Sequence, residues 1–218
     1  MGTTSFSQGQ LTQLSNNIGI AVATALPNVA KDLDPKITLR ALDGRGEIFA
    51  GHMEEALKQA LNRMFMLGNN GSVAVKLTER HDPDSFYQTR SGLWVYDGFR
   101  NLVVAKAQPT EAGTVFKLDH ALLTQNMTDE KIEGSLPKNH LFDESVLCAI
   151  IAQMIAEQPN GKEGKLLNNG YANLFYTSSC VVYVYWRAVY RKWYVRTWRR
   201  GDNGWDAGRR VFSPATGT

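Results

Sequence analysis

The chain has 218 residues, with 24 lysines and arginines against 21 aspartates and glutamates, and a formal net charge of +3. This length fits one large or two small domains and suffices to bury an apolar core without disulfides or metals. No apolar stretch approaches the roughly 20 residues that span a bilayer, and no secretory signal pattern opens the chain, so we expect a cytoplasmic protein without membrane contact. Both cysteines, Cys148 and Cys180, lie in apolar segments and are expected to be buried, reduced thiols.

The first third of the chain has the periodicity of helices. Residues 8–33 place leucine, isoleucine and valine at spacings of three and four, which is the period of one helix face. A proline at the first helical position predicts a short helix over 34–42, and residues 47–67 collect their apolar side chains in a single stripe. The sequence therefore predicts a helical region over residues 1–70, followed by an α+β domain over residues 71–218.

The middle of the chain mixes strand and helix patterns. Residues 72–77 alternate as a strand does, and residues 93–107 fit either a strand followed by a helix or a hairpin around an Asp-Gly turn. We favour the strand followed by a helix. Residues 142–158 are apolar around most of a helical circumference, which predicts a central, buried helix.

The last quarter of the chain has the pattern of an antiparallel sheet. Short polar breaks separate apolar and aromatic segments, and such spacings favour hairpins over crossovers. The predicted strands are 173–177, 181–187, 193–199 and 209–212. The expected fold class is α+β, with N-terminal helices, a central buried helix and a C-terminal antiparallel β-meander.

The segment VVYVYWRAVYRKWYVRTWRR, residues 181–200, interleaves aromatic rings with positive charges. Residues 181–212 contain eight basic residues and two acids, so they carry +6 of charge while the rest of the chain carries −3. Because strand residues alternate between faces, one sheet face is predicted to be apolar and the other to mix tyrosine, tryptophan and arginine. The candidate binding residues are Tyr183, Tyr185, Arg187, Arg191, Lys192, Tyr194, Arg196, Trp198, Arg199 and Arg200.

Three interpretations of this face stay open. Tyrosine and tryptophan favour strands for packing reasons, and arginines gain cation–π contacts on a solvated sheet without any ligand, so a plain structural sheet is the simplest interpretation. The same residues suit a protein partner. They also suit single-stranded nucleic acid, in which bases stack on aromatic rings while cations contact phosphates.

Other motifs are incomplete as functional sites. The His81–Ser85 loop, Gly44-Arg45-Gly46 and the Asn168–Tyr171 turn offer isolated polar groups, and adjacent amides in the last could recognise a polar ligand. No nucleotide fingerprint, metal-ligand spacing or nucleophile elbow is present. Cys148 lies in an apolar helix, where burial makes a thiol a poor nucleophile.

Three segments carry a resemblance to a known group of proteins. They are SGLWVYDGFRNLVVAKA, YANLFYTSSCVVYVYW and WDAGRRVFSP. Together they resemble bacterial hypothetical proteins that share a GYAN(L/I)FY segment, a tryptophan-rich meander and a closing GxxVFS. The resemblance covers roughly the last two-thirds of the chain. It implies a bacterial source and an intact C-terminal module, and no activity is attached to it.

The functional expectation is a binding protein that is not an enzyme and needs no cofactor or metal. The leading hypothesis is contact with single-stranded nucleic acid through the basic, aromatic face. The first alternative is an assembly component whose partner is another protein chain. The second is an uncharacterised hydrolase whose groups come together from distant positions.

Overall fold

The computed structural model describes residues 7–31, 33, 34, 36, 38, 40, 43, 45–201 and 203–215. The chain divides into two compact units, Met1–Ala56 and Leu57–Thr218. The boundary predicted at residue 70 falls inside the first strand, β1 (Leu67–Lys76).

The first unit is helical. Helix α1 (Gln8–Ala30) begins with a capping box, in which Ser7 Oγ accepts from the Gln10 backbone and the Gln10 side chain accepts from the Ser7 backbone. Helix α3 (Gly46–Met66) starts in this unit and extends into the next. The helix expected over 34–42 lies in part outside the described residues.

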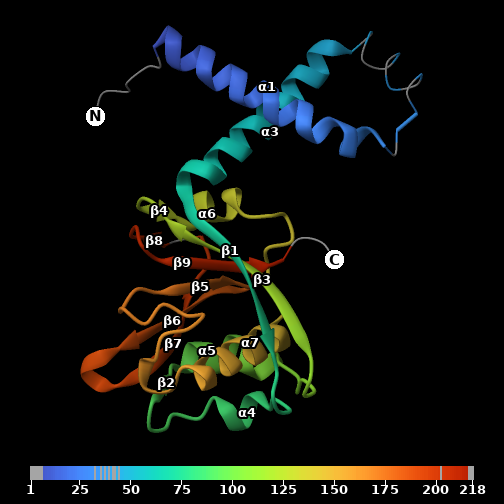
Figure 1. Cartoon of the computed structure of the whole chain (residues 1–218). Coiled ribbons are helices and arrows are strands. Elements are labelled where there is room, and N and C mark those ends of the chain that lie inside the picture. Colours follow the sequence, from blue (N-terminus) through green and yellow to red (C-terminus); the bar gives the residue numbers. More distant parts are fainter. Residues whose placement is uncertain are drawn as a thin grey trace. The chain divides into compact units, whose positions relative to one another are not determined.

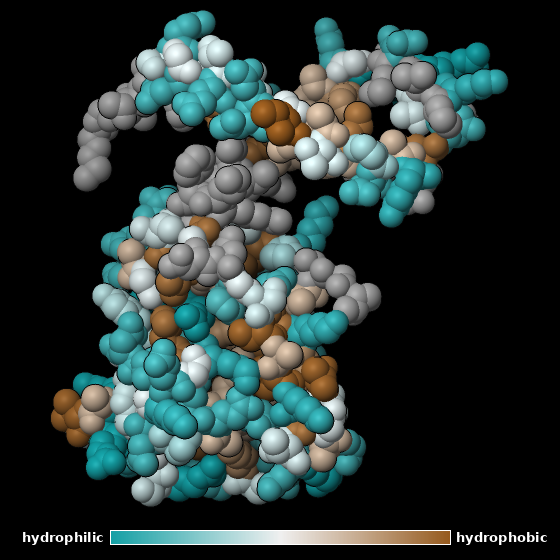
Figure 2. All heavy atoms as spheres, viewed as in Figure 1, coloured by the Kyte–Doolittle hydropathy of each residue, from teal (hydrophilic) through white to brown (hydrophobic). Residues whose placement is uncertain are grey.

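Apolar side chains of the first unit are exposed. None of its described side chains is buried, and its large exposed apolar residues include Ile20, Leu26, Ile48 and Phe49. Figure 2 shows these helices with apolar atoms scattered among polar ones. Helices of this kind gain most of their stability from packing an apolar face, and the described residues of this unit supply no core.

The second unit is built around a seven-stranded sheet with the strand order β1-β3-β9-β5-β6-β7-β2. The pairs β5–β9 and β2–β7 are parallel and the other pairs are antiparallel. A two-stranded sheet of β4 and β8 lies beside it (Figure 1). The bounds are β2 Leu93–Val95, β3 Val115–Leu123, β4 Met127–Thr128, β5 Asn173–Tyr176, β6 Cys180–Arg187, β7 Lys192–Arg199, β8 Gly204–Trp205 and β9 Arg210–Pro214.

Short helices and one long helix complete this unit. They are α4 Pro83–Phe86, α5 Asp97–Leu102, α6 Asp129–Ser135, α7 Glu144–Glu157 and the 3₁₀ turns η1 Val104–Lys106, η2 Pro159–Gly161 and η3 Ala188–Tyr190. Over residues 93–107 the strand followed by a helix is confirmed, because β2 leads directly into α5.

The α+β class is confirmed, and so is the central helix. Residues Leu147–Ile155 of α7 are buried without interruption. Ile150 and Met154 belong to the same apolar cluster as Val182 and Val195, which lie on the inner face of the sheet. Figure 1 shows α5 and α7 against one side of the sheet, with α6, β4 and β8 at another part of it.

The last strand departs from the expected hairpin order. Strands β5, β6 and β7 form a meander, but β9 lies between β3 and β5 instead of beside β7. Val211 and Phe212, which are adjacent in sequence and face opposite sides of the sheet, are both fully buried in different cores. A strand that is apolar on both faces fits an interior position, and the chain returns to it through β8. The register of β9 with β3 ends at Pro214, which cannot donate to a ladder, and one more backbone bond follows, from the Ala215 N–H to the Lys117 carbonyl at 3.0 Å.

Candidate functional site

A row of aromatic rings crosses the three strands β2, β7 and β6. The parallel pairing of β2 with β7 places Trp94 opposite Tyr194, and the antiparallel pairing of β7 with β6 places Tyr194 opposite Tyr185. The Trp94 and Tyr194 ring centroids are 6.2 Å apart at 20°, and those of Tyr194 and Tyr185 are 5.3 Å apart at 18°. These three residues, the aromatic row, therefore have nearly parallel rings. Trp94 is 41% exposed and forms the open end of the row.

Cations lie over rings beside this row. Lys192 Nζ is 5.4 Å from the Trp94 centroid, and the Arg187 guanidinium is 4.9 Å from the Tyr190 centroid and 5.8 Å from that of Tyr194. Each such contact contributes about 0.5–1 kcal/mol at an exposed site.

Arg196 lies one step further along the same face. Its guanidinium is 4.1 Å from the Tyr96 centroid and 5.6 Å from that of Tyr183. Burial by itself lowers the pKa of Arg196, but the neighbouring tyrosines, Tyr185 first, raise it above its ordinary value, so the guanidinium stays charged. Strands β2, β6 and β7 contain no aspartate or glutamate, and the positive charge of this face has no carboxylate beside it on these strands.

We call this surface the cationic aromatic face. Its members are Trp94, Tyr96, Tyr185, Arg187, Lys192, Tyr194 and Arg196. Burial raises the pKa of Tyr194, so this hydroxyl stays neutral at physiological pH and the charge of the face comes from its cations.

The structure brings together five of the ten predicted site residues in this face, namely Tyr185, Arg187, Lys192, Tyr194 and Arg196. Tyr183 shares the face but is buried in the second core, and burial raises its pKa to about 12. Trp198 is 42% exposed and lies beside Tyr183 and Trp205.

The other predicted cations lie elsewhere. Arg191 occupies the turn between β6 and β7 in a left-handed conformation with φ 50°. Strand alternation places Arg199 on the face opposite Arg196. Arg200 is held by Glu133, because its Nε donates to both carboxylate oxygens at 2.8 and 2.9 Å. These three residues are therefore not part of the cationic aromatic face.

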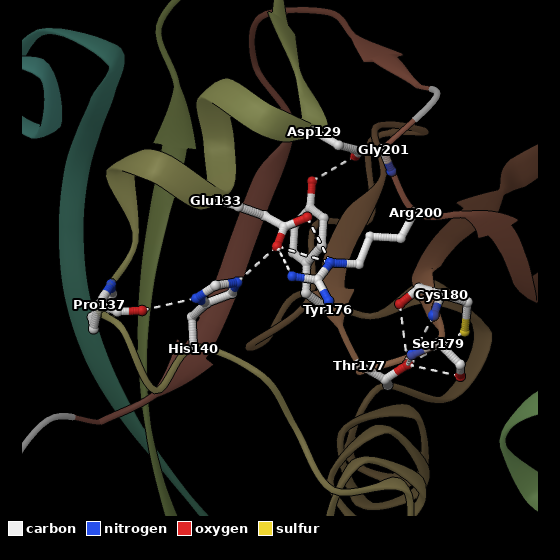
Figure 3. A network of polar contacts seen from close by, with 10 residues as sticks. All are labelled: Asp129, Glu133, Pro137, His140, Tyr176, Thr177, Ser179, Cys180, Arg200 and Gly201. Atoms are coloured by element: carbon white, nitrogen blue, oxygen red, sulfur yellow. Dashed lines mark hydrogen bonds and ion pairs between the residues drawn. The ribbon is translucent and has the colours of Figure 1, made fainter.

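Arg200 belongs to a polar network that ties α6 to the segment after β7 (Figure 3). Glu133 also contacts His140 Nε2 at 3.0 Å. Next to it, the fully buried Asp129 accepts from the Tyr176 hydroxyl at 2.7 Å and from the Gly201 backbone at 3.0 Å. Figure 3 shows these side chains converging between α6 and the sheet, and their contacts give this network a structural role.

Sequence reasoning missed Trp94 and Tyr96. Both lie in an alternating segment that was recognised as a strand, but no local pattern identifies β7 as its neighbour. The only available signal was the aromatic, apolar alternation of LWVY itself.

A cavity of about 360 Å³ adjoins the Tyr185 end of the row. It is lined by Asn168, Asn169, Gly170, Tyr185, Trp186, Arg187, Ala188 and Val189. The turn over residues 168–171, noted from the sequence, thus lies beside the aromatic row.

Groups with catalytic potential lie in other surroundings. Burial raises the pKa of the Cys148 thiol, which is fully enclosed beside α4 and the sheet, so the thiolate is disfavoured. Burial also lowers the pKa of His81 to about 4. Within the described residues, no group of three or more histidines, cysteines, aspartates or glutamates is placed to hold a metal ion.

Among the described helices, none is both long enough and apolar enough to cross a membrane. The chain has no significant match to a protein-family model, to a curated protein or to a solved structure. The resemblance to bacterial proteins with a GYAN(L/I)FY segment stays a prediction.

Proposed function

We propose that this protein binds single-stranded nucleic acid through the cationic aromatic face. The observation that carries the proposal is the in-register row of Trp94, Tyr194 and Tyr185, flanked by cations on strands that contain no acid. Single-strand binders combine the same two elements, aromatic rings on which bases stack and positive charge that follows the phosphates. Splayed bases stack on aromatic side chains or guanidinium planes in the same way in single-stranded RNA.

Exposed rings at the border of this face support the function, whereas Tyr194 in the middle of the aromatic row is only 8% exposed. Trp94 offers an open ring, and Tyr190, at 55% exposure, offers a second at the turn between β6 and β7. A cation–π contact orients Lys192 and Arg187 while leaving their net charge in place, so both can attract phosphate. The free thiols of Cys148 and Cys180 fit a reducing compartment, and we place this activity in the cytoplasm.

Two variants separate the stacking contribution from the charge contribution. Fluorescence anisotropy with labelled oligo-dT and oligo-rU, measured over a range of salt concentrations, gives affinity and salt slope together. Trp94→Ala should weaken binding by about 1–3 kcal/mol with little change of slope, because stacking is not a charge contact. Lys192→Ala should weaken binding and reduce the salt slope by about one unit, because one phosphate contact is lost.

Lys117→Ala is the matched control for Lys192→Ala. Lys117 is an exposed lysine on β3, which β9 and β5 separate from β6 in the sheet, so its loss should leave affinity and slope nearly unchanged. If the folded protein binds neither oligonucleotide at tens of micromolar at low salt, the proposal is wrong.

A specific observation favours an assembly component as the second candidate. The helices of the first unit expose Ile20, Leu26, Ile48 and Phe49 and bury none of their described side chains, so packing against another chain would supply the core that these helices lack. Sedimentation of the full chain distinguishes the two candidates, because a self-associating chain without nucleic-acid affinity supports assembly alone.

A further inference from the structure

The cavity beside Tyr185 lies where the sheet stops on one side of β6. Strand β5 begins at Asn173, which is paired with Val184. Beyond Val184, the loop that carries Asn168 and Asn169 replaces β5 as the neighbour of β6 and forms the opposite wall of the cavity. A volume of about 360 Å³ is within the range of small-ligand sites, roughly 300–1,000 Å³.

This wall is held in place by hydrogen bonds from both ends of the loop. Asn173 Oδ1 accepts from the Leu167 backbone at 2.8 Å, while Asn173 Nδ2 donates to the carbonyls of Leu167 and Val184 at 3.1 and 3.0 Å. Asn173 is fully buried, so these bonds are shielded from water. The loop and β6 are thereby joined, and the cavity is formed before any ligand arrives.

The two asparagines use one half of each side-chain amide to shape the loop. Asn168 Nδ2 donates to the Gly161 carbonyl at 2.8 Å, and Asn169 Oδ1 accepts from the Tyr171 backbone at 3.2 Å. In the described part of the chain, no hydrogen bond engages Asn168 Oδ1 or Asn169 Nδ2. One acceptor and one donor, on adjacent residues that line the cavity, therefore remain for a ligand.

The remaining walls supply a ring and a positive charge. Tyr185 is both the last member of the aromatic row and part of the cavity lining, and Arg187 lines the cavity from the same strand. An acceptor–donor pair, an aromatic ring and a guanidinium are the groups that proteins use to read the edge of an unstacked base, stack on it and contact its phosphate.

We propose that this cavity takes one nucleobase of the bound strand and makes binding base-selective, with Asn168 Oδ1 and Asn169 Nδ2 contacting the base edge. This inference rests on the proposed nucleic-acid function and adds a base-reading position to it. The bases on the aromatic row are held by stacking, which every base can satisfy, whereas the base in the cavity must match the amide pair.

The test is the ratio of affinities among dA, dC and dT homopolymers of about 12 nucleotides, a length within the usual site sizes of single-strand binders. The native protein should prefer one homopolymer over the weakest by about 5- to 150-fold, the selectivity that a paired base contact gives. Asn169→Ala should bring this ratio close to one by weakening the preferred homopolymer and leaving the weakest nearly unchanged.

Asn169→Asp is the second variant, and it guards against misfolding. The Asp side chain keeps an acceptor for the Tyr171 backbone but replaces the Nδ2 donor with an oxygen, so the loop is retained and the base contact is lost. Its added negative charge weakens all homopolymers together, and the ratio should still fall. Asn101→Ala, at an exposed asparagine of α5, is the matched control and should keep the native ratio.

The outcomes separate the two proposals. Binding with the same ratio in the native protein and in both Asn169 variants overturns the base-reading cavity and leaves the cationic aromatic face intact. Equal affinity of the native protein for all three homopolymers also overturns the base-reading cavity and leaves the cationic aromatic face intact. Absence of any binding by the folded native protein overturns both.

Discussion

Asp129 is a carboxylate that is fully enclosed and satisfied by donors from four residues. They are the Tyr176 hydroxyl, the Trp205 indole N–H, the Gly201 backbone N–H, and the backbone and side-chain N–H groups of Asn203. A buried carboxylate costs free energy unless it is hydrogen-bonded in this way. Asp129 therefore connects the start of α6 to β5 and to the segment between β7 and β8.

We expect Asp129→Ala to lower the free energy of unfolding by at least about 3 kcal/mol, because hydrogen bonds to a charged group contribute about 1.5–3 kcal/mol each and several donors lose their acceptor together. Denaturant unfolding followed by circular dichroism measures the change. The control is Asp206→Ala, since Asp206 is exposed and pairs with Arg209 at the surface, and surface pairs contribute at most about 1 kcal/mol. Equal losses in the two variants would contradict the structural role of Asp129.

Among the described helices, α7 has the greatest share of buried residues. Its side chains from Leu147 to Ile155 are enclosed on all sides, and Asp143 caps its N-terminus by accepting from the Ser145 and Val146 backbones. The helix packs on the face of the sheet opposite to the cationic aromatic face, since Val182, Val184 and Val195 point toward it. It therefore supports the strands that carry the aromatic row.

We expect Ile150→Ala to lower the free energy of unfolding by about 2–5 kcal/mol, the range for emptying a well-packed site. Val189→Ala, at an 89% exposed position, is the control and should change it by less than about 0.5 kcal/mol. Chemical denaturation of both variants is sufficient, and an unchanged midpoint for Ile150→Ala would show that α7 is not the centre of the core.

For the whole molecule, the position of the last strand matters most. Strand β9 joins β3 to β5, so it connects the β1–β3 pair to the meander that carries the candidate site. Val211 and Phe212 contribute to the two different cores of the sheet. The C-terminal strand is thus the element on which both faces of the sheet depend.

A chain that ends at Gly208 should lose its cooperative thermal transition. The deletion removes two fully buried side chains, each of which contributes about 1.5–3 kcal/mol, and also leaves the backbone of β3 and β5 unpaired. Such a loss is large against a typical domain stability of about 5–15 kcal/mol. A chain that ends at Ala215 keeps all of β9 and should unfold as the full chain does. Calorimetry of both chains decides, and a normal transition in the shorter one would refute the central role of β9.

The amino-acid sequence by itself determined the local elements of this protein. The strands near 173–199 and the buried helix near 144–157 were predictable because alternation and helical periodicity are properties of neighbouring residues. The same alternation predicted that Tyr185, Tyr194 and Arg196 share a face.

Only the tertiary structure decided which strands are neighbours. Trp94 and Tyr96 belong to the site because β2 pairs in parallel with β7, which is distant from it in sequence. In the same way, β9 lies between β3 and β5, although β3 is far from β9 along the chain. Arg200 is not part of the cationic aromatic face because it forms an ion pair with Glu133 of α6, a contact between segments that are distant in sequence. Local periodicity does not predict such contacts, since their free energy depends on which apolar faces and charges meet after the chain has folded.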